Sequence, residues 1–273
     1  TIETDGQSID GKGATIKRAE QFETTTNTTI TSGSTDTITL ASVSGLEVGD
    51  IIIPEKSGNF DHLGRVVESI VGSVVTVESP FALADVDGNA VASATGPINI
   101  YTGYNQVSVL AKDVRITDLV LDGNSSNWTW GRWQHTAAVI TGVAEGQESD
   151  NFMMDHCKVI NQFGDGIDPG GPGNVIAHNW IENIKGRGIV FSGMEGTPTN
   201  IGCRCVFNHV IDCNTDVNVG GHDGLGSIDF SQGGPNTLIE GNYISGGYDG
   251  INSAVVQNAS MNIIANEILD MTR

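Results

Sequence analysis

A short pattern of apolar and polar positions returns several times between residues 151 and 269. Each copy has an apolar residue, an Asn or (once) a Cys three positions later, and an aliphatic residue two positions beyond that. The copies are residues 152–159, 174–181, 203–210, 237–244 and 261–268. A second mark, a small residue followed by Ile or Val, occurs at residues 138–139, 166–167, 188–189, 227–228 and 250–251. Repetition of this kind indicates a repeat architecture.

The spacing of these marks predicts the kind of repeat. Cys157 and Asn179 are 22 residues apart, and Asn242 and Asn266 are 24 apart. A unit this short, with period-2 alternation and Gly or Asn between its strands, has no room for a helix and a strand pair. It suits one coil of three short strands, each stacking about 4.8 Å from its copy in the next coil. The chain is therefore predicted to be an all-β solenoid.

Stacking of the coils predicts three ladders of equivalent residues. The apolar members of two interior ladders are residues 116, 154, 176, 205, 239 and 263, and residues 121, 159, 181, 210, 244 and 268. A third ladder of Asn179, Asn208, Asn242 and Asn266 is expected at one corner, where Asn tolerates the bend and hydrogen-bonds along the stack. His156 and His178 occupy the same coil position and are expected to line this corner.

The Asn ladder and the coil length resemble the right-handed parallel β-helix of the pectate-lyase-like superfamily. The resemblance covers roughly residues 105–273 and, in part, the first 20 residues. It implies a right-handed, single-stranded parallel β-helix with coils of roughly 22–24 residues. That superfamily includes lyases, glycosidases, epimerases, phage tailspikes and adhesins, so the fold implies no single activity.

The N-terminal third departs from the coil pattern. Residues 1–29 are predicted to form a first coil and a linker. Residues 30–84 alternate short β-branched runs with Gly and Pro turns, which predicts a small β-rich inserted module. Residues 85–104 are a predicted connection, and residues 105–273 the β-helix. The chain stops within a coil, so we expect a further C-terminal domain, or the other copies in a homotrimer, to cover the open end.

Charge and composition exclude several classes of partner. The formal charge is −20, from 13 basic and 33 acidic residues, which argues against nucleic acid. No run of 18 apolar residues exists, so membrane insertion is not expected. The four cysteines are expected to be buried thiols, not disulfides or zinc ligands. The resemblance implies action outside the cell, as a secreted, cell-surface or virion protein.

Two long insertions leave the coil at the same corner. In each coil we count the residues from the corner position, which is Asn, Cys or Leu, to the Ile or Val that follows the next small residue. This separation is 10 residues from Cys157 to Ile167, but 20 residues from Leu119 to Val139 and again from Asn208 to Ile228. Both insertions therefore overhang one strand face, where sites on rigid scaffolds are commonly built. The first insertion supplies candidate substrate-binding residues, whose rings are expected either to stack on sugars or to fold back against the helix: Trp128, Trp130, Arg132 and Trp133.

Strand alternation places acidic residues on the face beneath these insertions. Asp168 and Asp229 are predicted to point outward from positions two coils apart, roughly 9–10 Å at 4.8 Å per step. That separation is near the one with which an inverting glycosidase uses one carboxyl as acid and another to activate water. Arg187 is expected to orient substrate or to lower the pKa of a carboxylate. The neighbouring candidates for substrate binding are Asp165 (whose alternative role is a turn residue), Lys185 and Asn252.

Family motifs narrow the chemistry only in part. Asn214-Thr215-Asp216 and Gly221-His222-Asp223 are similar to polygalacturonase motifs, but they lie in one loop and no Asp-Asp pair occurs between them. His222 and Asp223 are candidate catalytic residues because they lie in the second insertion, where they are expected either to supply a base or to belong to a flexible glycine-rich loop. Asp168-Pro169 is similar to the start of the Asp-Pro-His motif of alginate epimerases, with Gly170 in place of His. Lyases of this fold use a Lys or Arg base with carboxylate-bound calcium, a pattern that Arg187 and its acidic neighbours would fit.

The sequence thus predicts a β-helix that binds and cleaves a polysaccharide. Hydrolysis by Asp168 and Asp229, with no required cofactor, is the preferred chemistry. The alternatives are calcium-assisted elimination aided by Arg187, and a non-catalytic adhesin or phage tail component that binds through the Trp-rich insertion.

Overall fold

The computed structural model describes residues 1–61, 64–85, 88–129, 136–141, 149–191, 200–215, 226–247, 249–255 and 261–271. The chain divides into two compact units. The first contains Thr1–Ala19, Asn105–Ser126 and the chain from Thr136 onward; the second contains Glu20–Tyr104 and residues 127–129. Each unit has a hydrophobic core of its own.

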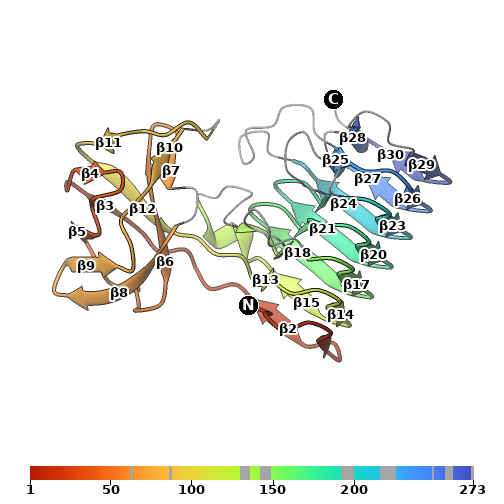
Figure 1. The fold of residues 1–273 in the computed structure, drawn as a ribbon, viewed down its shortest axis with the longest axis horizontal. Helices are drawn as coiled ribbons and strands as arrows, with labels where there is room; N and C mark the ends of the chain where they lie inside the picture. Colours follow the sequence, from red (N-terminus) through yellow and green to blue (C-terminus); the bar gives the residue numbers. More distant parts are fainter. Residues whose placement is uncertain are drawn as a thin grey trace. The chain divides into compact units, whose positions relative to one another are not determined.

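The first unit is a right-handed parallel β-helix, as the sequence predicted (Figure 1). Its three parallel sheets, named sheets A, B and C, each take one strand from every coil. Sheet A contains β13 (Val107–Val109), β16 (Val139–Thr141), β19 (Ile167–Asp168), β22 (Ile189–Val190), β25 (Ile228–Gly233) and β28 (Ile251–Val255). Sheet B contains β1 (Ser8–Asp10), β14 (Arg115–Thr117), β17 (Met153–Asp155), β20 (Val175–Ala177), β23 (Arg204–Val206), β26 (Thr237–Glu240) and β29 (Met261–Ile264). Sheet C contains β2 (Thr15–Lys17), β15 (Val120–Asp122), β18 (Lys158–Gln162), β21 (Trp180–Ile184), β24 (His209–Cys213), β27 (Tyr243–Ser245) and β30 (Glu267–Leu269).

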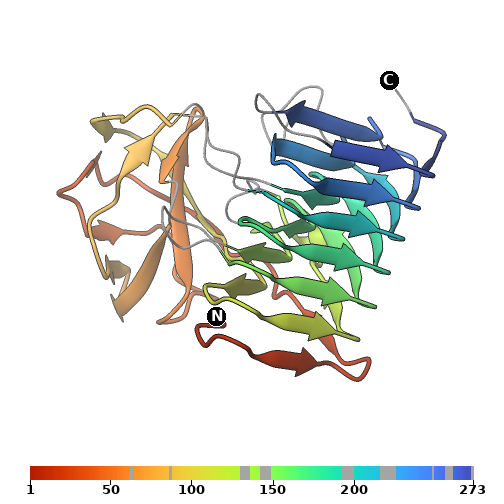
Figure 2. The same ribbon diagram turned by 45° about the vertical axis from the view of Figure 1, so that its right-hand side comes forward.

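The strand register confirms both predicted apolar ladders. In sheet B, Ile116 pairs with Met154 and the ladder continues in register to Ile263. In sheet C, Leu121 pairs with Val159 and the ladder continues to Ile268. Figure 2 shows the strands of successive coils lying side by side. Ile263 and Ile268 are 50% and 44% exposed, because they belong to the last described coil and no described coil lies beyond them.

The predicted asparagine ladder forms the corner between sheets B and C. The side-chain carbonyl of Asn208 accepts from both the backbone N–H and the side-chain amide of Asn179, each at 3.0 Å. Its side-chain amide donates to the carbonyl of Ile176 at 2.9 Å and to Asn242 Oδ1 at 3.0 Å. Asn242 makes the equivalent bonds to Asn266. Each amide therefore links three coils, and nearly all of its hydrogen-bonding capacity is used inside the protein.

We predict that Asn208→Ala lowers the free energy of unfolding by about 2–4 kcal/mol, because it leaves buried backbone and side-chain partners on two other coils without a hydrogen bond. Urea denaturation followed by circular dichroism measures the loss. The matched control is Asn262→Ala, at an exposed position of β29. Equal stability of the two variants would contradict a structural role for the ladder.

The four cysteines are buried thiols inside the β-helix, as expected. Burial raises the pKa of Cys157 and of Cys203 to about 11, and the pKa values of Cys205 and Cys213 are also raised by burial. Little thiolate therefore exists at neutral pH, and the thiolate is the reactive form.

We predict that iodoacetamide at pH 8 leaves all four thiols unmodified in the folded protein and alkylates all four after denaturation in urea. Intact-mass spectrometry counts the modified cysteines. Rapid alkylation of the folded chain would show that at least one thiol is accessible.

The second unit is an antiparallel β module. Its strands are β3 (Glu23–Thr26), β4 (Ile30–Thr31), β5 (Thr37–Thr39), β6 (Ile51–Lys56), β7 (Asn59–Asp61), β8 (Arg65–Val71), β9 (Val74–Val77), β10 (Leu83–Ala84), β11 (Ser93–Ala94) and β12 (Ile98–Thr102). The β-rich module predicted at residues 30–84 is part of this unit, and β3 and β12 also belong to it, because β12 pairs with both β3 and β6. Among the described residues, no helix is long and apolar enough to cross a membrane.

Candidate active site

The outward-facing side chains of sheet A form one ladder in which aliphatic residues and aspartates alternate from Ile140 to Asp229. Ile140 pairs with Asp168, Val190 pairs with Asp229, and Asp229 pairs with Asn252. Since Ile167 pairs with Ile189, Asp168 lies beside Val190. Asp168 and Asp229 therefore lie two coils apart with one valine between them, a strand separation of roughly 10 Å.

Both carboxyl groups are shielded from solvent. Asp168 is 1% exposed and Asp229 is 0% exposed, although their side chains point away from the β-helix core. Residues 162–171 are buried throughout. The sequence predicted only that these side chains point outward, and the structure shows that the outer face is covered around them. Alternation along a strand predicts to which face of the sheet a side chain points, but it does not predict which atoms pack against that face.

Arg187 joins acidic residues of the two coils on either side of its own. Its Nη2 donates to Asp165 Oδ2 at 2.7 Å, and its Nη1 donates to Asp229 Oδ2 at 2.9 Å. The backbone N–H of Arg187 also donates to Asp165 Oδ1 at 2.7 Å. All three side chains are buried, with Arg187 itself 6% exposed. A planar guanidinium with several donors is suited to bridging two carboxylates in this way.

The charges of this cluster keep Arg187 protonated. Burial by itself would lower the pKa of Arg187, but the nearby carboxylates Asp165, Asp229 and Asp168 raise it above its ordinary value. An arginine held in this form binds and orients anions, and it does not accept a proton. The contacts of Arg187 are those of a residue that pairs with carboxylates, and elimination with Arg187 as base stays an expectation from the sequence.

The neighbouring candidates contribute in different ways. Asn252 Nδ2 donates to Asp229 Oδ1 at 3.2 Å, so Asp229 is held on both of its oxygens. The Lys185 ammonium lies 4.1 Å from the centre of the Phe163 ring, a cation–π contact. Gly186 has a steric role, since a Cβ there would lie 2.6 Å from Asp165 Oδ1.

The first insertion is described only in part. Trp128 belongs to the β module, where it is 3% exposed and makes an edge-to-face contact with Tyr104 at 5.8 Å between ring centres. Of the two alternatives that the sequence left open, the Trp128 ring is folded back: it packs within the β module and is not exposed for stacking on a sugar. The other candidates of the two insertions lie outside the described residues: Trp130, Arg132, Trp133, His222 and Asp223.

A cavity of about 580 Å³ lies at the corner after sheet C, which the sequence did not predict. Asp212 and Asp270 line it on either side of Gly246, together with the hydroxyl-bearing residues Ser245 and Thr215. Asp212 is exposed, and a Cβ at Gly246 would lie 2.0 Å from its Oδ1. The signal in the sequence is an Asn, Asp or Gly at the same position of successive coils, at Asn183, Asp212, Gly246 and Asp270, and each of these residues has a positive φ in the structure.

The expected calcium site has no counterpart in the part of the chain that the structure describes. No group of three or more His, Cys, Asp or Glu side chains there is placed to hold a metal ion. The carboxylates of Asp165 and Asp229 are directed at Arg187. Calcium therefore stays an expectation from the sequence.

Comparison with known proteins identifies no family. No family model and no curated protein matches the chain. Three solved structures similar to this chain are phage tailspikes. Gp54 of Acinetobacter baumannii bacteriophage AP22, in complex with A. baumannii capsular saccharide, has a TM-score of 0.27 and 9% sequence identity, and the match covers 94% of this chain and 51% of that chain. Gp61 of Pseudomonas phage phi297 has a TM-score of 0.26 and 10% identity, with 99% of this chain and 62% of that chain covered, and gp49 of Pseudomonas phage LKA1 has a TM-score of 0.25 and 13% identity, with 97% and 52% covered. The chain spans about half to three fifths of the length of these tailspikes. At such low TM-scores, none of them assigns an activity to this chain.

We predict that Arg187→Met lowers the free energy of unfolding by about 3–5 kcal/mol, because it leaves two buried carboxylates without their cation. The control Arg204→Met removes an exposed arginine and should change the stability by less than about 0.5 kcal/mol. Thermal and urea unfolding measure both variants. A stable Arg187→Met protein would show that the cluster is readily solvated and is not the buried network described above.

Proposed function

We propose that this chain binds an extracellular polysaccharide along sheet A and hydrolyses its glycosidic bonds with Asp168 and Asp229. The coil pattern supports the substrate class, because it resembles a superfamily whose enzymes act on polysaccharides. The outward ladder of sheet A also supports it, since a linear array of side chains parallel to the helix axis suits a linear polymer. Action outside the cell is part of the proposal.

The observation that carries the proposal is the buried cluster of one arginine and three aspartates on sheet A. Taking ionised groups out of water is costly, and the described residues of the cluster include three carboxyl groups and one cation. Apolar residues at these positions would stabilise the β-helix at least as well. Buried charges that are grouped in this way are concentrated at functional sites.

The contacts suggest a division of roles between the two aspartates. Asp229 accepts hydrogen bonds from Arg187 and Asn252, which suit it to act as a carboxylate base. Asp168 then serves as the general acid. It donates its proton to the glycosidic oxygen as the bond to the anomeric carbon breaks, while Asp229 takes a proton from the attacking water. The products are an alcohol and a sugar with inverted anomeric configuration.

This mechanism requires that the polysaccharide reach the carboxyl groups of Asp168 and Asp229. Both carboxyl groups are almost fully shielded, so a polysaccharide reaches them only by displacing the atoms that cover sheet A. Binding energy from sugars on either side of the cleaved bond can drive such a displacement. Long polymers should therefore be cleaved faster than short oligosaccharides.

We predict that Asp168→Asn and Asp229→Asn each reduce hydrolysis by at least about 100-fold, because each removes one proton transfer. The assay is mass spectrometry of products from a panel of neutral and uronate polysaccharides in heavy-oxygen water. Saturated products that carry the label are expected. Asp212→Asn, which changes an exposed aspartate beside the cavity after sheet C, is the matched control and should retain activity.

Other outcomes would overturn the proposal in distinct ways. Loss of activity in Asp212→Asn but not in Asp168→Asn would move the site to the cavity. Unsaturated, unlabelled products would establish elimination. Binding without any product, in the wild type and in both sheet A variants, would make the chain a non-catalytic polysaccharide-binding protein.

A further inference from the structure

Asp165 is the aspartate of the sheet A cluster that has no role in the hydrolysis proposed above. It lies in the turn before β19 and is 1% exposed. Its Oδ1 accepts hydrogen bonds from the backbone N–H of Arg187 at 2.7 Å and from Arg187 Nε at 3.3 Å. Its Oδ2 accepts from Arg187 Nη2 at 2.7 Å. One carboxylate therefore holds both the backbone and the side chain of the arginine in the next coil.

The two turns that carry these residues lie directly against each other. The backbone N–H of Gly166 donates to the carbonyl of Arg187 at 2.8 Å, and that of Gly186 donates to the carbonyl of Gly164 at 3.2 Å. A Cβ at Gly186 would lie 2.6 Å from Asp165 Oδ1, so a larger residue there would push the carboxylate away. The contact between the two turns thus holds Asp165 against Arg187.

This contact also determines how Arg187 meets Asp229. Nε and Nη2 of Arg187 are directed at Asp165, and Nη1 donates to Asp229 Oδ2 at 2.9 Å. A guanidinium is planar and its donors have fixed directions, so the carboxylate on one side of the group decides where the donor on the other side lies. The second oxygen of Asp229 accepts from Asn252 Nδ2 at 3.2 Å. Asp165 therefore orients one of the two donors that hold Asp229.

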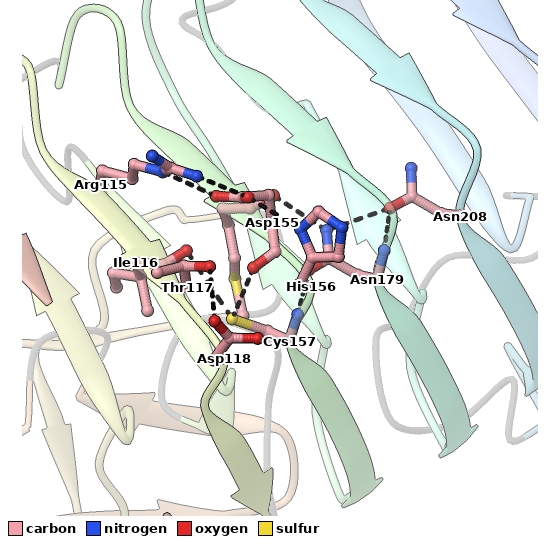
Figure 3. Close-up of polar contacts among 10 residues, drawn as sticks. Arg115, Ile116, Thr117, Asp118, Asp155, His156, Cys157, Asn179 and Asn208 are labelled. Atoms are coloured by element: carbon pink, nitrogen blue, oxygen red, sulfur yellow. Dashed lines mark hydrogen bonds and ion pairs between the residues drawn. The ribbon is translucent and has the colours of Figure 1, made fainter. Parts of the chain in front are cut away.

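Asp165 further divides the positive charge that acts on Asp229. A pair on sheet B shows the effect of an arginine whose hydrogen bonds go to one carboxylate. Arg115 donates to the two oxygens of Asp155 at 2.9 and 2.8 Å, and these hydrogen bonds lower the pKa of Asp155 (Figure 3). In the sheet A cluster two carboxylates share one guanidinium, and all three side chains are buried. Asp229 therefore binds a proton more readily than it would beside an undivided positive charge.

We propose that Asp165 is a positioning residue for the base Asp229, and that it acts through Arg187 without contact to the substrate. This role rests on the hydrolysis proposed above. Asp165 orients the guanidinium that holds the Asp229 carboxylate, and its charge keeps Asp229 basic enough to take a proton from the attacking water. If Asp165 served only the stability of the coil, its removal would lower the melting temperature and leave the pH dependence of the reaction unchanged.

The charges around Asp229 give the sign of the expected change in pH dependence. The charged residues of the described strands and turns next to it are Asp165, Asp168, Lys185, Arg187 and Asp249. Without the charge of Asp165, the charge of Arg187 acts undivided on Asp229 and Asp168, so both release their protons at lower pH. The acidic limb of the pH profile requires ionised Asp229 and moves to lower pH. The alkaline limb requires protonated Asp168 and moves in the same direction.

The first test compares Asp165→Asn with the parent, using the member of the neutral and uronate polysaccharide panel that the parent cleaves fastest. We expect kcat to fall about tenfold or more at a nearly unchanged KM, and the acidic limb to move down by about one pH unit. Asp165→Glu keeps the charge but displaces the guanidinium, so it should lower kcat and leave the acidic limb near that of the parent. The matched control is Asp155→Asn, which removes the carboxylate of the Arg115 pair and should change neither kcat nor the pH profile.

A titration without substrate distinguishes failure of this proposal from failure of the proposed hydrolysis. Aspartate carboxyl groups labelled with carbon-13 are followed by NMR against pH, and the Asp229 signal is the one lost in Asp229→Asn. Its midpoint should lie about one pH unit lower in Asp165→Asn than in the parent. Equal midpoints in the two folded proteins overturn the positioning role, whether or not the parent is active. A lower midpoint in Asp165→Asn, with no cleavage by the parent, overturns the hydrolysis and leaves the coupling of Asp165 to Asp229 in place.

Asp165→Glu decides the matter if Asp165→Asn does not fold. The longer side chain retains the negative charge, and the space beside Gly186 does not admit it without a shift of Arg187. A kcat equal to that of the parent in Asp165→Glu would overturn the proposal, because the position of Arg187 would then have no effect on the reaction.

Discussion

The hydrogen bonds of the corner asparagines are the constraint on which the first unit depends. Each amide joins its own coil to the one before and the one after it, as Asn208 does with Asn179 and Asn242. A shift of one residue in any coil would break these bonds and turn the apolar ladders outward. The register of all three sheets is therefore fixed at one corner, by buried polar groups that have few other partners.

Fixed register places every outward side chain directly beside its equivalents in the neighbouring coils. On sheet A this brings Asp165, Arg187 and Asp229 together from three consecutive coils, so that a cation lies between two anions. On the corner between sheets B and C the same stacking brings aromatic rings together. One constraint thus produces two very different arrays, a buried ionic cluster and an exposed aromatic surface.

The two arrays differ in what they cost and in what they can bind. The sheet A cluster is stabilised by mutual pairing of its charges, and a substrate must compete with Arg187 for the carboxylates. The aromatic rows at the corner between sheets B and C are exposed, with Phe207 48% exposed and Trp180 39% exposed.

The sequence by itself determined the coils, the two interior ladders and the asparagine corner, because burial inside a stack imposes apolar residues at a fixed period of 22–24 residues. It also determined that Asp168 and Asp229 lie two coils apart, since strand alternation and coil length fix that position. Only the tertiary structure decided that both carboxyl groups are shielded and that Arg187 bridges to Asp229. Outward positions show no periodic signal, and their surroundings depend on side-chain conformations and on packing outside the sheet, which strand alternation does not encode.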